Sequence, residues 1–348
     1  MSHFRAEIDR MTGYAPGEQP QVGKFIKLNT NENPYRCSPA VNRAIQTVLE
    51  RGLERYSDSM ATAFRERAAD VLGVGPDWIM AANGSDEILT IVTRAFVGEG
   101  QRIRLPFPSY ILYKTLAEIQ GAQSEEVHFR RDWTLGDDFS QAAADLRLVF
   151  LPNPNSPSGT VLSPARVLEI AQRLPCPLLV DEAYVDFAET SCLDLVKQTD
   201  KVLISRTFSK SYALAGLRFG FVVAQPHVIA GLVKLKDSYN CDALSIAGAV
   251  AAIDDQRWLA ETRGKIIATR ERMTRALREL GFDAVDSQAN FVWCPHPQVP
   301  VKPLYERLKE NRVLVRYMHY AGWGDGLRIS IGADDQVDAC LALLKGMI

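Results

Sequence analysis

Residues 207–218 of the chain are Thr207-Phe208-Ser209-Lys210-Ser211-Tyr212-Ala213-Leu214-Ala215-Gly216-Leu217-Arg218. They follow a short apolar run, residues 201–205, which predicts a β-strand. Hydroxyl-bearing and small side chains flank the lysine, without the acidic neighbours that accompany many surface lysines. A lysine that is desolvated or held near another cation loses part of its proton affinity and can attack a carbonyl carbon. Lys210 is therefore a candidate nucleophile.

The same stretch also offers groups that suit an anion. The hydroxyls of Thr207 and Ser209 and the guanidinium of Arg218 can donate hydrogen bonds to a phosphate. Pyridoxal phosphate carries both an aldehyde for the lysine and a phosphate for these donors. The alternative, on this stretch alone, is an ordinary strand followed by a tightly packed turn with a solvated lysine.

Composition excludes several classes of protein. The 348 residues are 47% hydrophobic and 24% charged, which is typical of a globular protein with a large core. The 40 basic and 42 acidic residues leave a net charge of −2, so no overall attraction to nucleic acid or to membranes is expected. Six scattered cysteines without a CxxC pair predict neither a metal site nor a disulfide framework. Without an apolar leader or an 18-residue apolar run, a cytoplasmic location is expected.

Alternating strand and helix patterns predict the fold class. Residues 146–151 and 178–180 are continuous apolar runs of the kind found in buried parallel strands, and helical patterns lie between such runs. We expect an α/β fold, with a large domain of mostly parallel sheet flanked by helices and a smaller α+β domain. The expected limits are 1–50 for an N-terminal arm and part of the small domain, 51–255 for the large domain and 256–348 for the small C-terminal domain. In the last of these, strands are predicted at 282–285, 291–294, 313–316 and 327–331.

Polar residues follow several predicted strands directly. In parallel sheets ligands collect at the carboxyl ends of the strands, where Gly84, Tyr110, Asn155, Asp181 and Lys210 all fall. At Gly84-Ser85-Asp86 a strand, a glycine turn and a helix would aim free backbone N–H groups at a phosphate, although an ordinary helix cap fits the same residues. Asp181 is either a buried carboxylate that needs a cationic partner or a cap for the next helix.

Two arginines, Arg316 and Arg328, lie in or beside apolar strands. An arginine there needs an anionic partner. A substrate carboxylate or phosphate and a structural Asp or Glu remain equal alternatives.

Eight motifs carry a resemblance to a known family. The chain lacks GxGxxG, GxxxxGK[ST] and GxSxG, the motifs of dinucleotide, nucleoside-triphosphate and serine-hydrolase sites. It resembles the fold type I pyridoxal-phosphate aminotransferases, and within them the histidinol-phosphate aminotransferases. The matching motifs are LNTNENP at 28–34, RYSD at 55–58, NGSDE at 83–87, PFPSY at 106–110, NPNSPSG at 153–159, VDEAY at 180–184, RTFSKSYALAGLRFG at 206–220 and GLRISIG at 326–332.

The resemblance implies a role for each matching residue. Lys210 would bond covalently to the cofactor's aldehyde, and Asp181 would pair with its ring nitrogen. Tyr184 would bond the ring hydroxyl, and Tyr110 would stack on the ring. The cofactor phosphate would be held by Ser85, Asp86, Ser209 and Arg218, with Gly84 and Thr207 beside them and Tyr56 from the other subunit of a homodimer. The substrate would be bound by Arg328, with Arg316, and by Tyr14 and Asn31 of the N-terminal arm.

Two motifs depart from the family pattern. The asparagine that the family often places before Pro-[Ser/Thr]-Gly is Ser156 here, so the contact with the ring hydroxyl is expected from Asn155, one residue earlier. The RYSD motif lacks a proline common in the family.

The resemblance implies transamination between small molecules, glutamate as amino donor and a phosphorylated imidazole substrate, in histidine synthesis. The alternatives within the same fold are an aromatic amino acid aminotransferase and a threonine-phosphate decarboxylase. A non-catalytic regulator or ligand-binding module is a third, from another class.

Overall fold

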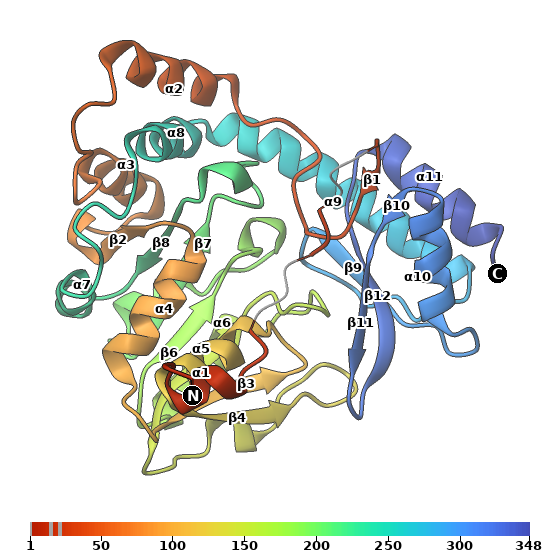
Figure 1. The fold of residues 1–348 in the computed structure, drawn as a ribbon, viewed down its shortest axis with the longest axis horizontal. Coiled ribbons are helices and arrows are strands. Elements are labelled where there is room, and N and C mark those ends of the chain that lie inside the picture. Colours follow the sequence, from red (N-terminus) through yellow and green to blue (C-terminus); the bar gives the residue numbers. More distant parts are fainter. Residues whose placement is uncertain (1, 14–16, 20–22) are drawn as a thin grey trace.

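The computed structural model describes residues 2–13, 17–19 and 23–348, and its centre is a seven-stranded sheet (Figure 1). The strand order is β2-β8-β7-β6-β5-β3-β4. β8 runs antiparallel to both of its neighbours, and the other pairs are parallel. The predicted α/β fold with a mostly parallel sheet is therefore confirmed. The strands are β2 Ile79–Ala82, β3 Arg102–Phe107, β4 Gln123–His128, β5 Leu146–Pro152, β6 Leu178–Asp181, β7 Val202–Thr207 and β8 Gly220–Val223.

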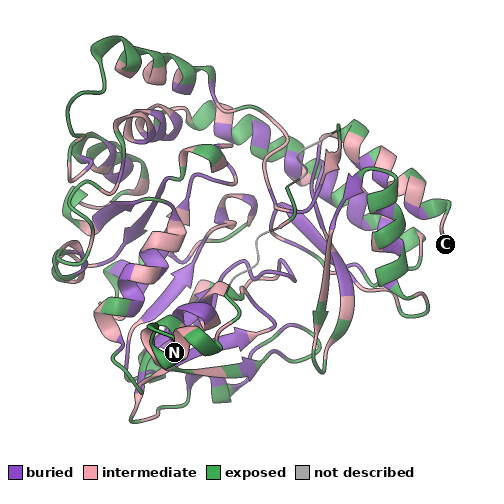
Figure 2. Ribbon diagram, in the orientation of Figure 1, coloured by how far each residue is buried: buried purple, intermediate pink, exposed green. Residues whose placement is uncertain are grey.

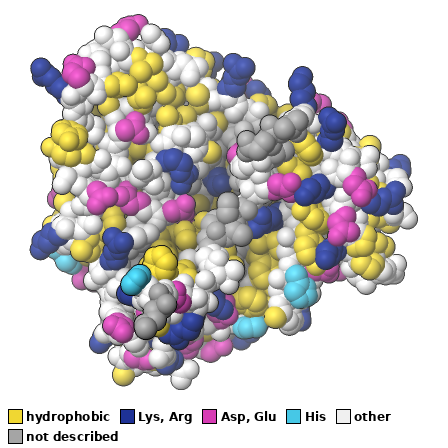
Figure 3. Space-filling model, viewed as in Figure 1, with side chains coloured by type: hydrophobic (Ala, Val, Ile, Leu, Met, Phe, Trp, Pro, Cys, Tyr) yellow, Lys and Arg dark blue, Asp and Glu magenta, His cyan; other side chains and the backbone are white. Residues whose placement is uncertain are grey.

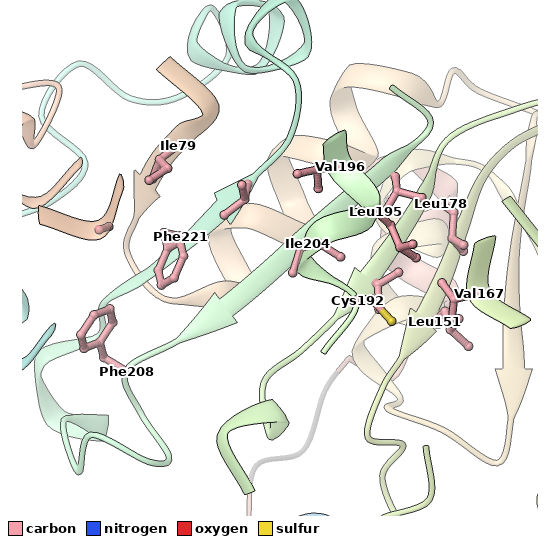
Figure 4. Close-up of a cluster of buried hydrophobic side chains, with 14 of the residues drawn as sticks. Ile79, Leu151, Val167, Leu178, Cys192, Leu195, Val196, Ile204, Phe208 and Phe221 are labelled. Atoms are coloured by element: carbon pink, nitrogen blue, oxygen red, sulfur yellow. The ribbon is translucent and has the colours of Figure 1, made fainter. Parts of the chain in front are cut away.

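Both faces of this sheet are covered, which is why its strands are continuous apolar runs. Along β5, Val149 and Leu151 belong to one buried cluster, and Leu148 and Phe150 belong to another on the opposite face. Figure 2 shows the buried residues gathered on the sheet and the inner sides of the helices, and Figure 4 shows the first cluster. The flanking helices are α3 Thr62–Leu72, α4 Ser85–Phe96, α5 Leu112–Gln120, α6 Pro164–Arg173, α7 Pro226–Val233 and α8 Ala243–Asp254.

Outside these layers, α2 Pro39–Arg51 packs against α8. Ser38 caps α2, as the Ser-Pro pair predicts, because its hydroxyl accepts a hydrogen bond from the backbone N–H of Ala40. Short 3₁₀ turns lie at Pro76–Trp78, Asp137–Ser140, Val185–Phe187, Leu193–Lys197 and Ala215–Leu217.

The C-terminal part has its own core around a three-stranded antiparallel sheet of order β11-β12-β9. Near the N-terminus, β1 Ile26–Lys27 pairs in parallel with β10 Val313–Leu314, so the start of the chain contributes to this part (Figure 1). The short helix α1 Ala6–Arg10 packs instead against α5. The predicted domain limits at residues 50 and 255 remain predictions. The remaining elements are β9 Phe291–Cys294, β11 Arg316–Tyr320, β12 Gly324–Ser330, α9 Gln256–Glu279, α10 Val301–Glu310 and α11 Asp334–Lys345.

The strand predicted at 282–285 is wrong, because this segment is irregular. Its backbone approaches β9, but the carbonyl oxygen of Ala284 accepts hydrogen bonds from the guanidinium of Arg278 instead of a strand partner. The segment predicted as one strand at 313–316 divides between β10 and β11.

Within the described part of the chain, no helix combines the length and apolarity that crossing a membrane requires. Acidic and basic side chains are interspersed over the face drawn in Figure 3.

Candidate active site

A cavity of about 450 Å³ opens at the carboxyl ends of the sheet strands. It is bordered by residues of the large sheet's loops, of the N-terminal segment and of β11 and β12. Of the predicted site residues, Gly84, Asn155 and Tyr56 do not line it, and Tyr14 lies outside the described residues. Those that line it are Asn31, Ser85, Asp86, Tyr110, Asp181, Tyr184, Thr207, Ser209, Lys210, Arg218, Arg316 and Arg328.

Lys210 lies in the loop after β7, with its amine in the cavity. The Nζ atom donates a hydrogen bond to the carbonyl oxygen of Thr30 at 3.1 Å and lies 5.8 Å from the ring centre of Tyr184. Burial lowers the pKa of Lys210 to about 8, and the cations Arg328 and Arg218 contribute in the same direction. Near neutral pH a larger fraction of this amine is therefore uncharged than of an ordinary lysine. Nucleophilic attack and proton abstraction both require the uncharged form.

Asp181 is the last residue of β6 and is buried. Its carboxylate accepts hydrogen bonds from the Tyr113 hydroxyl at 2.8 Å, the Ser205 hydroxyl at 3.2 Å and the backbone N–H of Ala183 at 3.1 Å. All three donors are neutral, and no Lys, Arg or His among the described residues forms an ion pair with it. Burial raises the pKa of Asp181 to about 6, so the ionised form lacks the cation that would stabilise it.

Sequence reasoning missed Tyr113. This tyrosine lies on α5, is fully buried and stacks on Phe150 with 4.7 Å between ring centres. Its place on the apolar face of a helix is that of any core aromatic residue, and only the pairing of distant segments brings it to Asp181.

The start of α4 and the lysine loop together form an anion site. Gly84 precedes α4 with φ 79° and ψ 166°, and no side chain caps the first turn. Arg218 donates to the Ser209 hydroxyl at 3.2 Å and pairs with Asp86 at 3.3 Å, so the guanidinium lies beside this helix start. A Cβ atom at Gly84 would lie 2.7 Å from Arg218 Nη2, which shows how closely the guanidinium approaches the backbone. Free N–H groups at a helix N-terminus next to an arginine suit a phosphate.

Asn31 connects the N-terminal segment to the cavity. Its amide donates to the Tyr184 hydroxyl at 2.9 Å, and its side-chain oxygen accepts from the Ser330 hydroxyl at 2.9 Å. Burial raises the pKa of Tyr184, so its hydroxyl stays protonated at neutral pH and can donate a hydrogen bond.

Arg316 and Arg328 are directly opposite each other across the β11–β12 pair. Arg328 donates to the Ser156 hydroxyl at 3.0 Å and to the carbonyl oxygen of Asn29 at 3.1 Å. Its Nε atom is buried without a hydrogen-bond partner, and among the described residues no Asp or Glu pairs with this guanidinium. For Arg328 the alternative of a structural salt bridge is therefore not supported by the contacts of the described chain.

Asn155 and Ser156 lie differently with respect to the cavity. The Asn155 amide donates to the Ser158 hydroxyl at 2.9 Å and its side-chain oxygen is buried without a partner, whereas Ser156 lines the cavity. The contact expected between Asn155 and the cofactor's ring hydroxyl stays a prediction. Of the two residues, Ser156 is the one that lines the cavity.

Tyr56 is 82% exposed and stacks on Tyr239, with ring centres 4.4 Å apart. Its predicted contact with the cofactor of another subunit stays a prediction.

The chemical groups that line the cavity suit the aldehyde, the ring nitrogen and the phosphate of pyridoxal phosphate. The cavity combines a lysine of lowered pKa, a buried carboxylate without a cation and a helix N-terminus beside an arginine. Its volume is that of a pocket for a small ligand. The described residues contain no group of three His, Cys, Asp or Glu side chains arranged for a metal ion.

Comparisons with known proteins agree with this site. The sequence model of the family "Aminotransferase class I and II" matches residues 23–344. A histidinol-phosphate aminotransferase of Rhodopirellula baltica is 57% identical over 343 residues, which are 98% of this chain and 95% of that protein. Histidinol-phosphate aminotransferase 1 of Trichormus variabilis is 42% identical over 348 residues, which are 100% of this chain and 99% of that protein.

The fold is also similar to solved structures. The crystal structure of histidinol-phosphate aminotransferase from Sinorhizobium meliloti in complex with pyridoxal-5'-phosphate has a TM-score of 0.89 and 25% identity, covering 100% of this chain and 99% of that one. The aromatic aminotransferase of Pyrococcus horikoshii has a TM-score of 0.81 at 23% identity, covering 94% of this chain and 96% of that one, and shows the fold alone.

Proposed function

The chain belongs to the class I and II aminotransferases, among the histidinol-phosphate aminotransferases, and on that premise we propose that it exchanges amino groups between histidinol phosphate and 2-oxoglutarate in histidine synthesis. The resemblance inferred from its motifs is thereby confirmed. The observation that carries the proposal is that Lys210, Asp181 and Arg328 line one cavity.

Lys210 is the central group of the proposed mechanism. Pyridoxal phosphate, when bound, supplies an aldehyde that accepts the amino group and a ring that accepts the electron pair released when a Cα–H bond breaks. Lys210 would hold the cofactor by its aldehyde, and as a free amine its Nζ would accept the Cα proton of the substrate and later return it. The lowered pKa of Lys210 suits both tasks.

Asp181 would keep the cofactor's ring nitrogen protonated. Burial disfavours the ionised form of Asp181, and a protonated ring nitrogen would supply the cation that stabilises it. Tyr184 would donate to the ring hydroxyl, Tyr110 would stack on the ring, and either Asn155 or Ser156 would complete the contacts. The phosphate would be held by the backbone of Ser85 and Asp86 together with Ser209 and Arg218, beside Gly84 and Thr207.

Arg328 binds the anionic end of either substrate. Histidinol phosphate offers a phosphate and no α-carboxylate, whereas 2-oxoglutarate and glutamate offer carboxylates. A planar guanidinium can form two parallel hydrogen bonds with either group. Arg316, directly opposite Arg328, assists, and Asn31 and Tyr14 contribute from the N-terminal segment.

The protein is further proposed to act as a homodimer in the cytoplasm, with Tyr56 reaching the cofactor phosphate of the partner subunit. The exposure of Tyr56 supports this arrangement. An active monomer in solution would contradict it.

The substrate assignment is tested by kcat/KM for histidinol phosphate, phenylalanine and threonine phosphate on the purified holoenzyme. Histidinol phosphate should be preferred by about a hundredfold or more, because only a site built for its phosphate and ring pairs all of its polar groups. A preference for phenylalanine would indicate an aromatic aminotransferase, and release of CO₂ from threonine phosphate a decarboxylase.

The covalent role of Lys210 is tested separately. Borohydride reduction of the holoenzyme should fix the cofactor's mass on the peptide that contains Lys210, and Lys210→Ala should abolish transamination. An unlabelled peptide would remove Lys210 from the mechanism.

A further inference from the structure

The two cavity arginines lie on a hairpin whose turn contacts the large sheet. β11 and β12 pair from Arg316 opposite Arg328 to Tyr320 opposite Gly324, where the chain turns. In Figure 1 this hairpin extends from the C-terminal part toward the loops beside β4. The base of β12 belongs to the core of the C-terminal part, whereas Trp323 packs against the core of the large sheet.

Three residues make the contact at the turn. Arg131 donates hydrogen bonds to the carbonyl oxygens of Gly322 at 2.6 Å and Trp323 at 3.4 Å, and its guanidinium lies 4.8 Å from the centre of the Trp323 ring. The Trp323 ring also packs against the ring of Trp133, with 4.5 Å between the ring centres. We name Arg131, Trp133 and Trp323 the hairpin clamp.

The loop side of the clamp is firmly placed. Trp133 is buried and contacts Phe129 with 5.7 Å between ring centres, and its backbone N–H donates a hydrogen bond to the carbonyl oxygen of Arg130 at 2.8 Å, which closes the turn. A second contact lies beside the clamp, where Tyr320 meets Phe107 edge to face at 5.7 Å. Phe107 is the last residue of β3, next to the loop that carries Tyr110.

Asp181 ends a strand of the large sheet and Lys210 lies in the loop after β7, whereas Arg316 and Arg328 lie on the hairpin. The distance between the reacting atoms and the anion-binding arginines therefore depends on how the hairpin lies against the sheet. The position of the hairpin is set at its base by the hydrogen bond from Arg328 to Ser156. At its turn the position is set by the hairpin clamp. Errors in such distances cost substrate affinity and orientation.

We propose that the clamp residues Arg131, Trp133 and Trp323 are positioning residues that hold the arginine hairpin over the cavity and so determine the affinity for anionic substrates. The proposal rests on the proposed function, because it takes Arg316 and Arg328 as the substrate's anion site. It assigns a functional role to side chains that touch neither substrate nor cofactor.

The test uses Arg131→Ala in the holoenzyme, because Arg131 is exposed and its loss does not open the core. KM for histidinol phosphate and for 2-oxoglutarate should each rise about fivefold to twentyfold, with kcat changed less than about threefold. Hydrogen exchange in residues 316–324 should become faster by a similar factor. Trp323→Ala should behave in the same way, and Trp323→Phe, which keeps a ring, should restore most of the affinity.

Arg275→Ala is the matched control, since Arg275 is exposed on α9 away from the hairpin turn. Unchanged exchange and unchanged KM in Arg131→Ala and Trp323→Ala, relative to this control, would overturn the proposal. Faster exchange without a change in KM would also overturn it, because the clamp would then be structural alone.

Binding of inorganic phosphate to the holoenzyme, measured by calorimetry, separates this inference from the substrate assignment. If histidinol phosphate is not turned over but the clamp variants still weaken phosphate binding, the proposed function fails and the clamp stands. If the parent enzyme turns over histidinol phosphate and the variants bind phosphate as it does, the clamp fails alone.

Discussion

Tyr113 donates a 2.8 Å hydrogen bond to Asp181 while its ring stacks on Phe150 in the core. The carboxylate that lines the cavity is thus oriented by a side chain that packing holds in one position. The hydrogen bond also opposes the effect of burial, since it lowers the pKa that burial raises.

Tyr113→Phe should therefore raise the pKa of Asp181 without opening a cavity. In the cofactor-free chain a larger fraction of the carboxyl is then protonated at pH 6, and the protonated form cannot pair with a cationic ring nitrogen. Kd for pyridoxal phosphate, measured by absorbance titration of the cofactor-free chain, should therefore rise roughly threefold to tenfold at pH 6 and less at pH 8. Equal losses of affinity at both pH values would show that the tyrosine acts only through packing.

Asp181→Asn should stabilise the cofactor-free chain while it abolishes transamination. The folded-state pKa of about 6 lies above the ordinary 3.8, so ionisation of Asp181 destabilises the fold as pH rises from 3.8 through 6. Removing the charge should raise the free energy of unfolding by up to about 3 kcal/mol at pH 8, with little change near pH 4. Urea unfolding at the two pH values measures the difference, and a destabilised variant at pH 8 would contradict this expectation.

The sequence predicted those features that leave a local pattern. Continuous apolar runs such as residues 146–151 predicted buried strands, and Lys210, a candidate nucleophile from its hydroxyl-bearing neighbours, lines the cavity. By contrast β4, with exposed and half-buried residues at an edge of the sheet, has no such run. The segment 282–285 has the composition of a strand, but the carbonyl oxygen of Ala284 accepts a hydrogen bond from Arg278 instead of from a neighbouring strand.

Side chains that act through distant contacts could not be predicted in this way. Tyr113 and Trp323 are core-like aromatic residues in sequence, and their roles follow from partners 68 and more residues away. Asn155 shows the same dependence on packing, because its motif places it in a loop of the site while its side-chain amide donates to Ser158 and the residue does not line the cavity, so its contact with the ring hydroxyl stays a prediction. Motif position determines the loop, whereas the rotation of each side chain depends on tertiary packing.

Arg328→Gln should raise the pKa of Lys210 from about 8 toward its ordinary 10.5, because one of the cations that disfavour its charged form is removed. The neutral fraction of the amine at pH 8 then falls. In the cofactor-free chain, chemical modification of Lys210 at pH 8 should slow by roughly threefold. Peptide mass spectrometry measures the rate, with the exposed Lys302 as internal control, and an unchanged rate ratio would show that burial alone determines this pKa.

Gly84→Ala should weaken cofactor binding. The backbone at φ 79° and ψ 166° is a conformation that costs a residue with a Cβ on the order of 1–3 kcal/mol, and the new methyl would lie 2.7 Å from Arg218 Nη2. The guanidinium must move away from the proposed phosphate site, so Kd for pyridoxal phosphate should rise about tenfold or more. Gly216→Ala is the matched control, since a Cβ there meets nothing within 4 Å. Equal affinities of the two variants, measured by absorbance titration, would remove this glycine from the site.

Glu182→Gln should be the most destabilising of these changes. Glu182 follows Asp181, is fully buried and pairs with Arg206 at 2.8 Å, and it also accepts hydrogen bonds from Ser191 and the backbone N–H of Cys192. The substitution leaves the Arg206 cation, whose side chain is only 15% exposed, without its counter-charge. The free energy of unfolding should fall by about 3–5 kcal/mol, measured by urea unfolding.

The exposed pair Asp194 and Lys197 supplies the control, because its partners have 80% and 45% of their side-chain surface in solvent. Asp194→Asn should leave stability within experimental error, since exposed ion pairs contribute little. Replacing both members of the buried pair, as Glu182→Leu with Arg206→Met, should cost less than Glu182→Gln alone, because no unpaired charge remains buried. A double variant at least as unstable as the single one would mean that the hydrogen bonds to Ser191 and Cys192, and not the uncompensated cation, dominate the loss.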